Sequence, residues 1–297
     1  MVTKEIQPQH AHEIKQAIKG YQLNIEKLIR ENIHELGLKT TLRDACEYAL
    51  TNGGKRFRPA LVYMIANALQ QGADVSQAAL SVEYLHTASL IADDLPCMDD
   101  DDERRSKPST HKVYGESTAL LASYALIAAG YECLAKNARS LSASKQTHAK
   151  NGDRIGVLAL GNVTYNTGLF GATGGQFLDI NPPDLTMESL IDIIKKKTVS
   201  LFEISFVLGW LFGGGDIAEL PKVKKAALHF GLAFQIADDL QDVEQDKANG
   251  RKVNVACVFG AEKAKKVVHC EIEAYKKIIQ ALPIEKKELL SLVDLLN

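Results

Sequence analysis

Residues 91–107 read I-A-D-D-L-P-C-M-D-D-D-D-E-R-R-S-K, and the rest of the chain is best interpreted outward from this stretch. Six aspartates fall within its ten positions 93–102. The apolar pattern of residues 74–95 predicts a helix, so Asp93 and Asp94 lie at its carboxyl end. A helix C-terminus carries negative partial charge and disfavours more of it, so the cluster indicates a bound cation.

Magnesium fits this cluster best, because it takes hard oxygen ligands, commonly one or two carboxylates together with substrate phosphates. Arg104 and Arg105 follow one turn later and would hold the phosphate oxygens that bridge to the metal. The alternative is a solvated acidic loop, which is the usual fate of a run of charges. On this stretch alone the two interpretations are equally supported.

The composition is that of an ordinary globular protein, with 297 residues, 46% of them hydrophobic and 24% charged. A formal net charge of −2 gives no argument for nucleic acid or an anionic membrane as a partner. The five cysteines form no C-x-x-C pair, which is typical of reduced thiols. No secretory signal is visible in the first ten residues. We therefore expect a cytoplasmic protein.

The most apolar run, residues 199–212, is short for a membrane span and contains Glu203. We interpret it as a buried core helix and expect no stable membrane insertion. Residues 116–135 are also apolar on most faces, and together the two segments suggest a central helix wrapped by others.

Nearly every segment has helical periodicity, and no stretch alternates as a strand would. Glycines and prolines separate the segments, and no linker or internal repeat divides the chain. The prediction is a single all-α domain over residues 1–297, with about ten helices. The predicted helices cover residues 10–36, 40–52, 57–71, 74–95, 115–138, 153–172, 186–213, 220–244, 255–281 and 284–296.

A second acidic cluster, F-Q-I-A-D-D-L-Q-D, occupies residues 234–242. Gln235, Asp238 and Asp242 are spaced i, i+3, i+7 and therefore share one helix face. Their neighbours are apolar, so this helix is largely buried, and buried carboxylates are costly unless they are paired or metal-bound. This cluster is harder to explain as ordinary surface than the first.

Residues 53–59 read G-G-K-R-F-R-P, in which two glycines allow a tight turn before Pro59 opens the next helix. A helix N-terminus beside lysine and arginine side chains is suited to binding an anion. A solvated basic helix start is the alternative, and the anion site is favoured only in combination with the aspartates.

Residues 171–180 read G-A-T-G-G-Q-F-L-D-I. Glycines in a helical pattern cost stability, so they indicate a bend or the close approach of another helix. Gln176 and Asp179 are interpreted as polar partners within the core, with a role in a site as the alternative.

Taken in order, these motifs resemble the trans-polyprenyl diphosphate synthases, the head-to-tail prenyltransferases. The shared motifs are G-G-K-R-F-R-P, D-D-L-P-C-M-D, R-R-S-K-P, H-K-V-Y-G-E, G-G-Q-F-L-D, K-T and F-Q-I-A-D-D-L-Q-D, and they cover nearly the whole chain. Residues 86–102 are especially similar to plastid-type geranylgeranyl diphosphate synthases. The resemblance implies the isoprenoid synthase fold, in which the helices surround a central cavity.

The resemblance also implies condensation of isopentenyl diphosphate with an allylic diphosphate, namely dimethylallyl, geranyl or farnesyl diphosphate, by a homodimer. It implies about three Mg²⁺ ions per site, with Mn²⁺ as a possible substitute. The implied metal ligands are Asp93, Asp94, Asp99, Asp238 and Asp242. The residues implied for isopentenyl diphosphate are Lys55, Arg58, His86 and Arg105. Those implied for the allylic diphosphate are Arg104, Lys197, Thr198 and Gln235. The predicted catalytic residues are Asp93, Asp99, Asp238 and Lys197.

Product length follows from the helix that ends at Asp93. In the family, a bulky aromatic four or five positions before the first aspartate stops growth at farnesyl length. Ser89 and Ala88 occupy these positions and are small, so Leu85 is the next plausible stop, with Val82 beyond it. One isoprene unit spans about 5 Å, close to the ~5.4 Å pitch of a helix turn. We therefore expect geranylgeranyl diphosphate (C20) as the product, with farnesyl diphosphate (C15) as the alternative.

Three features depart from the family pattern. Ala92 stands where a histidine is usual, and Tyr124 replaces an aspartate. The segment after Asp242 is degraded, and Arg251 or Lys252 is the candidate for its phosphate-binding lysine.

The departures at Tyr124 and after Asp242 favour a second hypothesis, a non-catalytic synthase-like subunit that tunes a partner. The intact Asp93, Asp99, Asp238 and Lys55 favour an enzyme, because a disused site has no reason to keep costly buried charges. A third hypothesis, a terpene cyclase, shares aspartate-rich helices but does not need a second phosphate site at residues 53–59.

Overall fold

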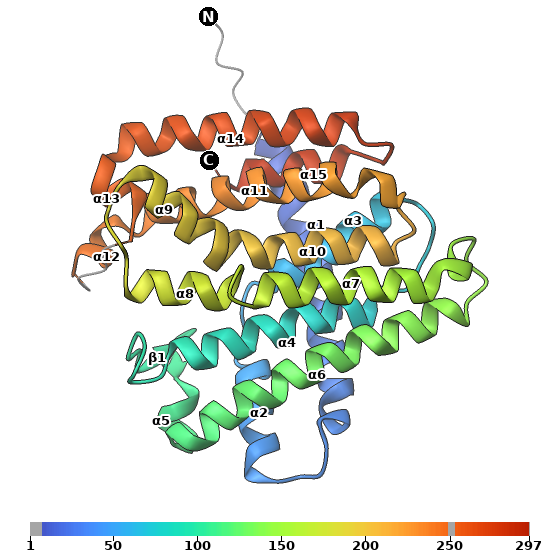
Figure 1. Ribbon diagram of the computed structural model, residues 1–297, viewed down its shortest axis with the longest axis horizontal. Helices are drawn as coiled ribbons and strands as arrows, with labels where there is room; N and C mark the ends of the chain where they lie inside the picture. The colour runs from blue at the N-terminus through green and yellow to red at the C-terminus, as the bar shows by residue number, and fades with distance from the viewer. Residues whose placement is uncertain (1–7, 249–252, 297) are drawn as a thin grey trace, which may run out of the picture.

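The computed structural model describes residues 8–248 and 253–296, with side chains described for residues 13–246 and 253–296. Figure 1 shows long helices lying side by side, so the all-α prediction is confirmed. In the described part, strand structure is confined to one antiparallel hairpin, β1 (Glu103–Arg104) with β2 (Lys107–Pro108).

The α-helices have the following bounds. They are α1 (Pro8–Asn32), α2 (Thr41–Thr51), α3 (Phe57–Ala68), α4 (Ser76–Asp93), α5 (Thr110–Tyr114), α6 (Glu116–Ser142), α7 (Gly152–Thr167), α8 (Ala172–Ile180), α9 (Met187–Ile194), α10 (Ser200–Phe212), α11 (Leu220–Gln241), α12 (Val243–Ala248), α13 (Val255–Phe259), α14 (Ala261–Ala281) and α15 (Lys287–Ser291). Short 3₁₀ turns cover Ile33–Leu36, Ala149–Asn151, Ile217–Glu219 and Leu292–Leu295, and a π-helical turn covers Lys195–Val199.

The predicted segments agree with these helices over most of their length, but some boundaries differ. The segment predicted as one helix over residues 186–213 is divided by the π-helical turn into α9 and α10. The segment predicted over residues 255–281 breaks at Gly260, whose φ of +84° interrupts the helix. The short helices α5 and α8 were not predicted, because short polar or glycine-rich runs carry little periodic signal.

The core is organised around α10, as predicted for residues 199–212. All of its residues are buried except Glu203. It packs against α3, α4, α7 and α11. Phe202 packs edge-on against Phe230 of α11 at a ring-centroid distance of 5.4 Å, and the Phe206 ring packs against it in a tilted arrangement at 5.9 Å. Burial of such large apolar side chains is the main term that holds the bundle together.

The other apolar helix, α6, does not occupy the centre. Its most apolar stretch is only 39% buried, although α6 packs closely along α4. Within the described residues, α6 is the one helix long and apolar enough, by length and composition, to cross a membrane. The expected lack of membrane insertion stays a prediction.

A buried ion pair fixes the basic turn before α3. The Arg56 guanidinium is fully buried, and its Nε donates to Glu26 Oε1 of α1 at 2.7 Å. It also pairs with Glu83 of α4 and donates to the Leu50 carbonyl of α2. One side chain thus joins four helices, so the middle cation of G-G-K-R-F-R-P has a structural role.

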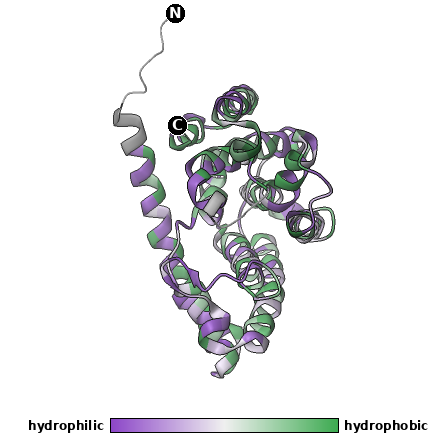
Figure 2. Cartoon of the chain, turned by 90° about the vertical axis from the view of Figure 1, so that its left-hand side faces the viewer, coloured by the Kyte–Doolittle hydropathy of each residue, from purple (hydrophilic) through white to green (hydrophobic). Residues whose placement is uncertain are grey.

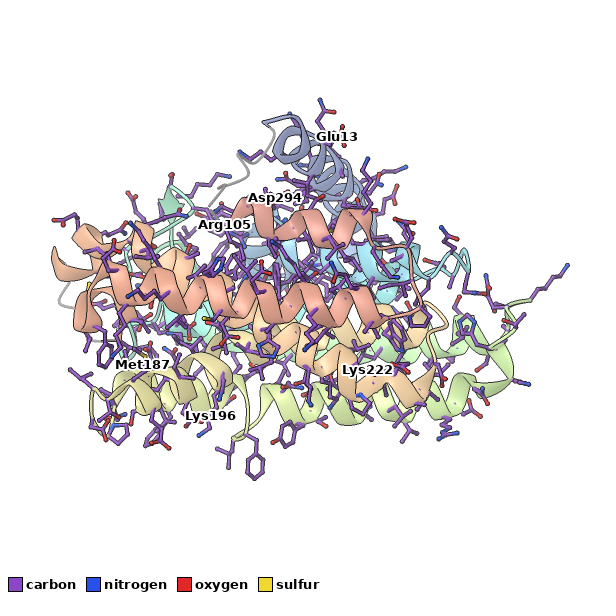
Figure 3. The ribbon with its side chains drawn as sticks, turned by 90° about the horizontal axis from the view of Figure 1, so that it is seen from above. Glu13, Arg105, Met187, Lys196, Lys222 and Asp294 are labelled. Carbon is purple, nitrogen blue, oxygen red and sulfur yellow. The ribbon has the colours of Figure 1, made fainter. Side chains whose placement is uncertain are left out.

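The two helices that carry the aspartate clusters, α4 and α11, finish at the same end of the bundle. In Figure 1, α4 runs toward β1 and α11 runs toward α12, both at the left. Figure 2 looks at that end, where most of the long helices are seen end on and α1 runs along one side. Figure 3 places Arg105, Met187 and Lys196 toward this end and Lys222 toward the other. The chain therefore brings its charged motifs together.

Candidate active site

A polar cleft of about 430 Å³ opens where α4 and α11 end. Charged and polar side chains from both aspartate clusters, the π-helical turn, α8 and α12 line it. They are Asp93, Asp99, Arg104, Asp179, Lys197, Thr198, Gln235, Asp238, Asp239, Asp242 and Asp246. Residues far apart in the sequence are therefore brought together, as the resemblance to the family implied.

The first aspartate cluster contributes Asp93 and Asp99. The Asp99 amide donates to the Asp93 carbonyl at 2.9 Å, which closes the turn after α4 and presents both side chains to the cleft. Burial raises the pKa of Asp93 to about 7, and Asp99 adds to the effect, while Lys197 opposes it. The positive groups of the protein therefore do not offset the cost of burying the ionised Asp93 carboxylate. This is the environment expected of a residue that binds a cation.

The second cluster contributes Asp238 and Asp242 from the end of α11. Burial raises the pKa of Asp238 and the neighbouring Asp242 raises it further, while Lys55 and Arg58 oppose the shift. Asp239 lies beside them but is already bonded on both oxygens. It accepts from Gln235 Nε2 at 2.9 Å and from the Val255 amide at 2.8 Å, so it fixes the start of α13.

Asp94, which the sequence predicted as a metal ligand, is placed outside this cleft. Its side chain is only 3% exposed and accepts from Arg104 Nε at 2.8 Å. Arg104 also bonds Asp101 at 2.8 Å and lines the cleft. Since Asp94 is engaged in holding Arg104, we remove it from the proposed ligands.

Lys197 and Thr198 lie on the π-helical turn, a distortion that often marks functional sites. A Cβ on Gly175 of α8 would lie 2.2 Å from the Lys197 backbone nitrogen, so glycine is required for this approach. Asp179 of the same helix pairs with Lys197. The close helix approach predicted for residues 171–180 is therefore present, and it positions Lys197 at the cleft.

A chain of hydrogen bonds continues from this turn to α11. Thr198 Oγ1 donates to Gln235 Oε1 at 2.9 Å, and Gln235 Nε2 donates to Asp239 Oδ1 at 2.9 Å. The bonds fix the orientation of both the hydroxyl and the amide at the edge of the cleft.

The residues predicted for isopentenyl diphosphate form a second polar group beside the cleft. Arg58 Nη1 lies 3.4 Å from His86 Nε2, and its guanidinium lies 4.7 Å from the centre of the Phe202 ring. Burial lowers the pKa of Arg58 to about 10. Burial and Arg58 together hold the pKa of His86 well below its usual range, so the imidazole is neutral. Arg105 is held nearby by the Gly53 carbonyl.

This basic group has unused bonding capacity. Arg58 Nε and His86 Nδ1 are buried and have no hydrogen-bond partner within the described residues. Lys55 is exposed, and none of the group lines the acidic cleft. Buried donors need partners, so an anion held outside the acidic cleft fits these residues.

An apolar cavity of about 730 Å³ adjoins the cleft, and Asp93, Ile180 and Lys197 line both spaces. All three predicted chain-length residues, Leu85, Ala88 and Ser89, line this cavity. The remaining apolar and polar lining comes from α6, α7, α8 and α10 and includes Ser123, Ile127, Tyr131, Thr164, Thr167, Gln176 and Leu201. The polar cleft and the apolar cavity therefore form one continuous site.

Several of these lining residues were missed by the sequence interpretation. Ile127, Tyr131 and Thr167 lie in helices whose apolar pattern looks like ordinary core, so no local signal distinguished them. Both polar atoms of Gln176 are buried without a hydrogen-bond partner in the described part of the chain.

The structure also locates two of the residues that depart from the family pattern, Ala92 and Tyr124. Ala92 lines the apolar cavity, whereas Tyr124 is 58% exposed on α6 and does not contribute to the described lining. Arg251 and Lys252 lie outside the described residues.

A further group of possible metal ligands lies on the loop after α4. The ligand atoms of Asp100, Asp102 and His111 lie within 4.8 Å of one another. None of the three is part of the lining of the cleft or cavity described above.

Residues 39–256 match the sequence model of the family described as polyprenyl synthetase. The chain is 37% identical to geranylgeranyl pyrophosphate synthase 3, chloroplastic, of Arabidopsis thaliana, over 76% of this chain and only 65% of that protein. It is 31% identical to farnesyl diphosphate synthase of Bacillus subtilis (strain 168), over 92% of this chain and 93% of that protein. The crystal structure of a geranyltransferase from Legionella pneumophila is similar with a TM-score of 0.83 and 27% identity, covering 96% of this chain and 97% of that one.

We predict that Asp93→Asn stabilises the metal-free protein in a pH-dependent way. An aspartate has a pKa near 3.9 when unfolded, whereas folding raises that of Asp93 to about 7. Ionised Asp93 therefore lowers the free energy of unfolding as pH rises from about 4 to about 7, and the penalty is constant above that. Thermal unfolding in EDTA at pH 8 should show Asp93→Asn melting about 2–5 °C above wild type, a gain that vanishes near pH 4.

The matched control is Asp153→Asn, at an exposed aspartate on α7. It should change Tm little at any pH. An Asp93→Asn gain that is absent at pH 8, or equal at every pH, would show that burial of this carboxylate is not a cost to the fold.

Proposed function

The chain belongs to the polyprenyl synthetase family, and on that basis we propose that it is a short-chain trans-prenyltransferase. It joins isopentenyl diphosphate to an allylic diphosphate and makes mainly geranylgeranyl diphosphate. The observation that carries the proposal is the continuity of the carboxylate-lined cleft with the apolar cavity through Asp93, Ile180 and Lys197. A substrate with a diphosphate head and a hydrocarbon tail needs both spaces at once.

The carboxylates of the cleft fit divalent cations. Asp93, Asp99, Asp238 and Asp242 offer hard oxygen ligands, and burial makes the negative charge of Asp93 and Asp238 costly without a cation. About three Mg²⁺ ions held there would neutralise the allylic diphosphate and make it a better leaving group, and Mn²⁺ is the expected substitute.

The protein's own cations hold the allylic substrate. Lys197 and Arg104 face the cleft, each already oriented by carboxylate partners, and would contact the diphosphate oxygens. Thr198 and Gln235, fixed by their mutual hydrogen bond, present oxygen atoms at the same edge. When the bond between C1 and the diphosphate oxygen breaks, its electron pair leaves with the diphosphate and an allylic cation remains in a cavity that excludes water.

The second substrate occupies the basic group beside the cleft. Lys55, Arg58 and Arg105 supply positive charge, and the neutral His86 supplies a hydrogen bond without repelling its neighbours. The double bond of isopentenyl diphosphate attacks the allylic cation and forms the new carbon–carbon bond. The proton then lost goes to the released diphosphate, so no side-chain base is required.

The product is proposed from the side chains that line the cavity. Ala88 and Ser89 are small and leave the first turn of α4 above Asp93 open, and Leu85 lies on the next turn. Geranylgeranyl diphosphate is therefore favoured over farnesyl diphosphate. A non-catalytic subunit is less well supported, because Tyr124, one of the features that suggested it, lies away from the described site lining.

We also propose that the active form is a homodimer. Apolar side chains of α6 and α7 face outward, in the manner of an interface. They are Leu120, Leu121, Tyr124, Val157, Leu160 and Tyr165. The low burial of α6, a helix of such apolar composition, supports a second copy as the partner.

We predict that Asp238→Ala reduces turnover by at least about a thousandfold while the helical fold is retained. The change removes a carboxylate that would bind metal, and electrostatic stabilisation of this kind is worth several kcal/mol. The measurement is prenyl transfer at saturating Mg²⁺, with circular dichroism to check the fold. Asp153→Ala is the control and should retain turnover. Near-wild-type turnover in Asp238→Ala would contradict the metal assignment.

We predict that the two diphosphate sites are separable. Lys55→Ala should raise the KM for isopentenyl diphosphate about tenfold or more, because a charge-assisted phosphate contact is worth 1.5–3 kcal/mol. Lys197→Ala should mainly weaken the allylic substrate. Steady-state kinetics with each substrate varied in turn test this division, and equal effects of either change on both KM values would refute it.

We predict that Ala88→Tyr shortens the main product from C20 to C15. The aromatic ring would fill the cavity one turn from Asp93, where Ala88 is now completely buried. Ser76→Ala, at the far end of the same helix, is the control and should leave the product unchanged. Chromatography of the dephosphorylated products measures chain length. An unchanged C20 product in Ala88→Tyr would show that the tail does not pass this position.

We predict that Leu121→Arg produces a monomer at micromolar concentration. Leu121 is 53% exposed on α6, and a charge there would be buried without a partner in the dimer. Analytical ultracentrifugation measures the change. Leu38→Arg, at an 88% exposed leucine before α2, is the matched control and should leave the assembly intact. A wild type that sediments as a monomer, or a Leu121→Arg dimer, would rule out this interface.

A further inference from the structure

Two helices that run in opposite directions, α4 and α6, form part of the wall of the apolar cavity. Ser123 Oγ of α6 donates to the Ala88 carbonyl of α4 at 2.9 Å, so these residues mark the same level. Deeper in the cavity, the lining ends at Leu85 on α4 and at Tyr131 on α6. Tyr131 lies eight positions after Ser123, or about 12 Å along the helix, which is roughly two isoprene units.

Tyr131 is held in place by a hydrogen bond across the cavity wall. Its hydroxyl lies 3.2 Å from Thr167 Oγ1 at the end of α7. Thr167 donates its own hydroxyl hydrogen to the Val163 carbonyl at 2.8 Å. A threonine hydroxyl has a single hydrogen, so Tyr131 donates to Thr167 and the phenol ring is tied to α7.

The position of the Leu85 side chain depends on the absence of a side chain at Gly130. A Cβ on Gly130 of α6 would lie 2.9 Å from Leu85 Cγ and 3.4 Å from the Ser81 carbonyl oxygen. The backbone of α4 cannot yield easily there, whereas the leucine side chain can turn. The open space beside it is the cavity, so any side chain at position 130 would push Leu85 into the path of the tail.

We propose that Tyr131 is the floor on which the growing prenyl tail stops, and that Gly130 determines product length by leaving room for Leu85. Product length is then set by α6 together with α4, and not by α4 alone. This inference rests on the proposed function, since the ligand is the hydrocarbon tail of an allylic diphosphate.

The test compares product lengths from wild type and three variants incubated with Mg²⁺, isopentenyl diphosphate and geranyl diphosphate. Gly130→Ala should raise the ratio of C15 to C20 product about tenfold, as overpacking by one methyl costs on the order of 1–3 kcal/mol. Tyr131→Ala should give products longer than C20. Thr167→Val keeps the shape of the side chain but loses the hydrogen bond, and should give a mixture of C20 and longer products.

The matched control is Gly161→Ala, another glycine within a helix, where an added Cβ meets nothing within 4 Å. It should keep the wild-type product. Adding Leu85→Ala to Gly130→Ala removes the clash and should restore products of C20 or longer, a non-additivity that general damage to the fold would not give.

A binding measurement separates this inference from the proposed function. Calorimetry with farnesyl and geranylgeranyl diphosphate, in Mg²⁺, should show that Gly130→Ala loses affinity for the longer ligand about tenfold more than for the shorter. If wild type binds both diphosphates but forms no condensation product, the proposed function is contradicted. The binding measurement still tests the inference about the cavity. If Gly130→Ala does not fold, Tyr131→Ala and Thr167→Val carry the test. Wild-type length preferences in the folded variants, in product and in binding, would overturn the inference.

Discussion

The site depends on carboxylates that the bundle holds at the ends of two helices. Both burial and the helix dipole disfavour negative charge at these positions. Asp93 ends α4 and Asp238 lies in the last turn of α11, and both face one cleft. The pKa of each is raised by burial, despite the nearby Lys197, Lys55 and Arg58. In the proposed function, a cation that enters the cleft would remove this repulsion, so the unfavourable charge would favour cation binding.

The surrounding groups are fixed before any substrate arrives. Arg104 is held by Asp94, Lys197 by Asp179, and Thr198 by Gln235, so little side-chain entropy remains to be lost on binding. The rigid polar edge lies directly against an apolar cavity. This combination suits a reaction whose intermediate is a cation, because the charge is released next to fixed oxygen atoms and away from bulk water.

The sequence predicted the fold class and most helices, because periodicity is a property of neighbouring residues. The resemblance to the family implied that the two aspartate clusters would meet. The spacing of Gln235, Asp238 and Asp242 predicted only that these three residues share one helix face. The sequence could not predict that Asp94 would turn away from the cleft, because the Arg104 partner is brought close only by the turn and hairpin between them. The cavity floor was missed for a similar reason. Tyr131 and Gly130 look like core residues until α4 and α7 are packed against them.

The central claim is that one site holds a metal-bound diphosphate and a hydrocarbon tail of limited length. The most direct measurement is incubation of the purified protein with Mg²⁺, isopentenyl diphosphate and, separately, dimethylallyl, geranyl and farnesyl diphosphate, followed by chromatography of the products. The account predicts a C20 product from each primer and none when EDTA replaces Mg²⁺. Absence of condensation with every primer, or equal turnover in EDTA, would contradict it.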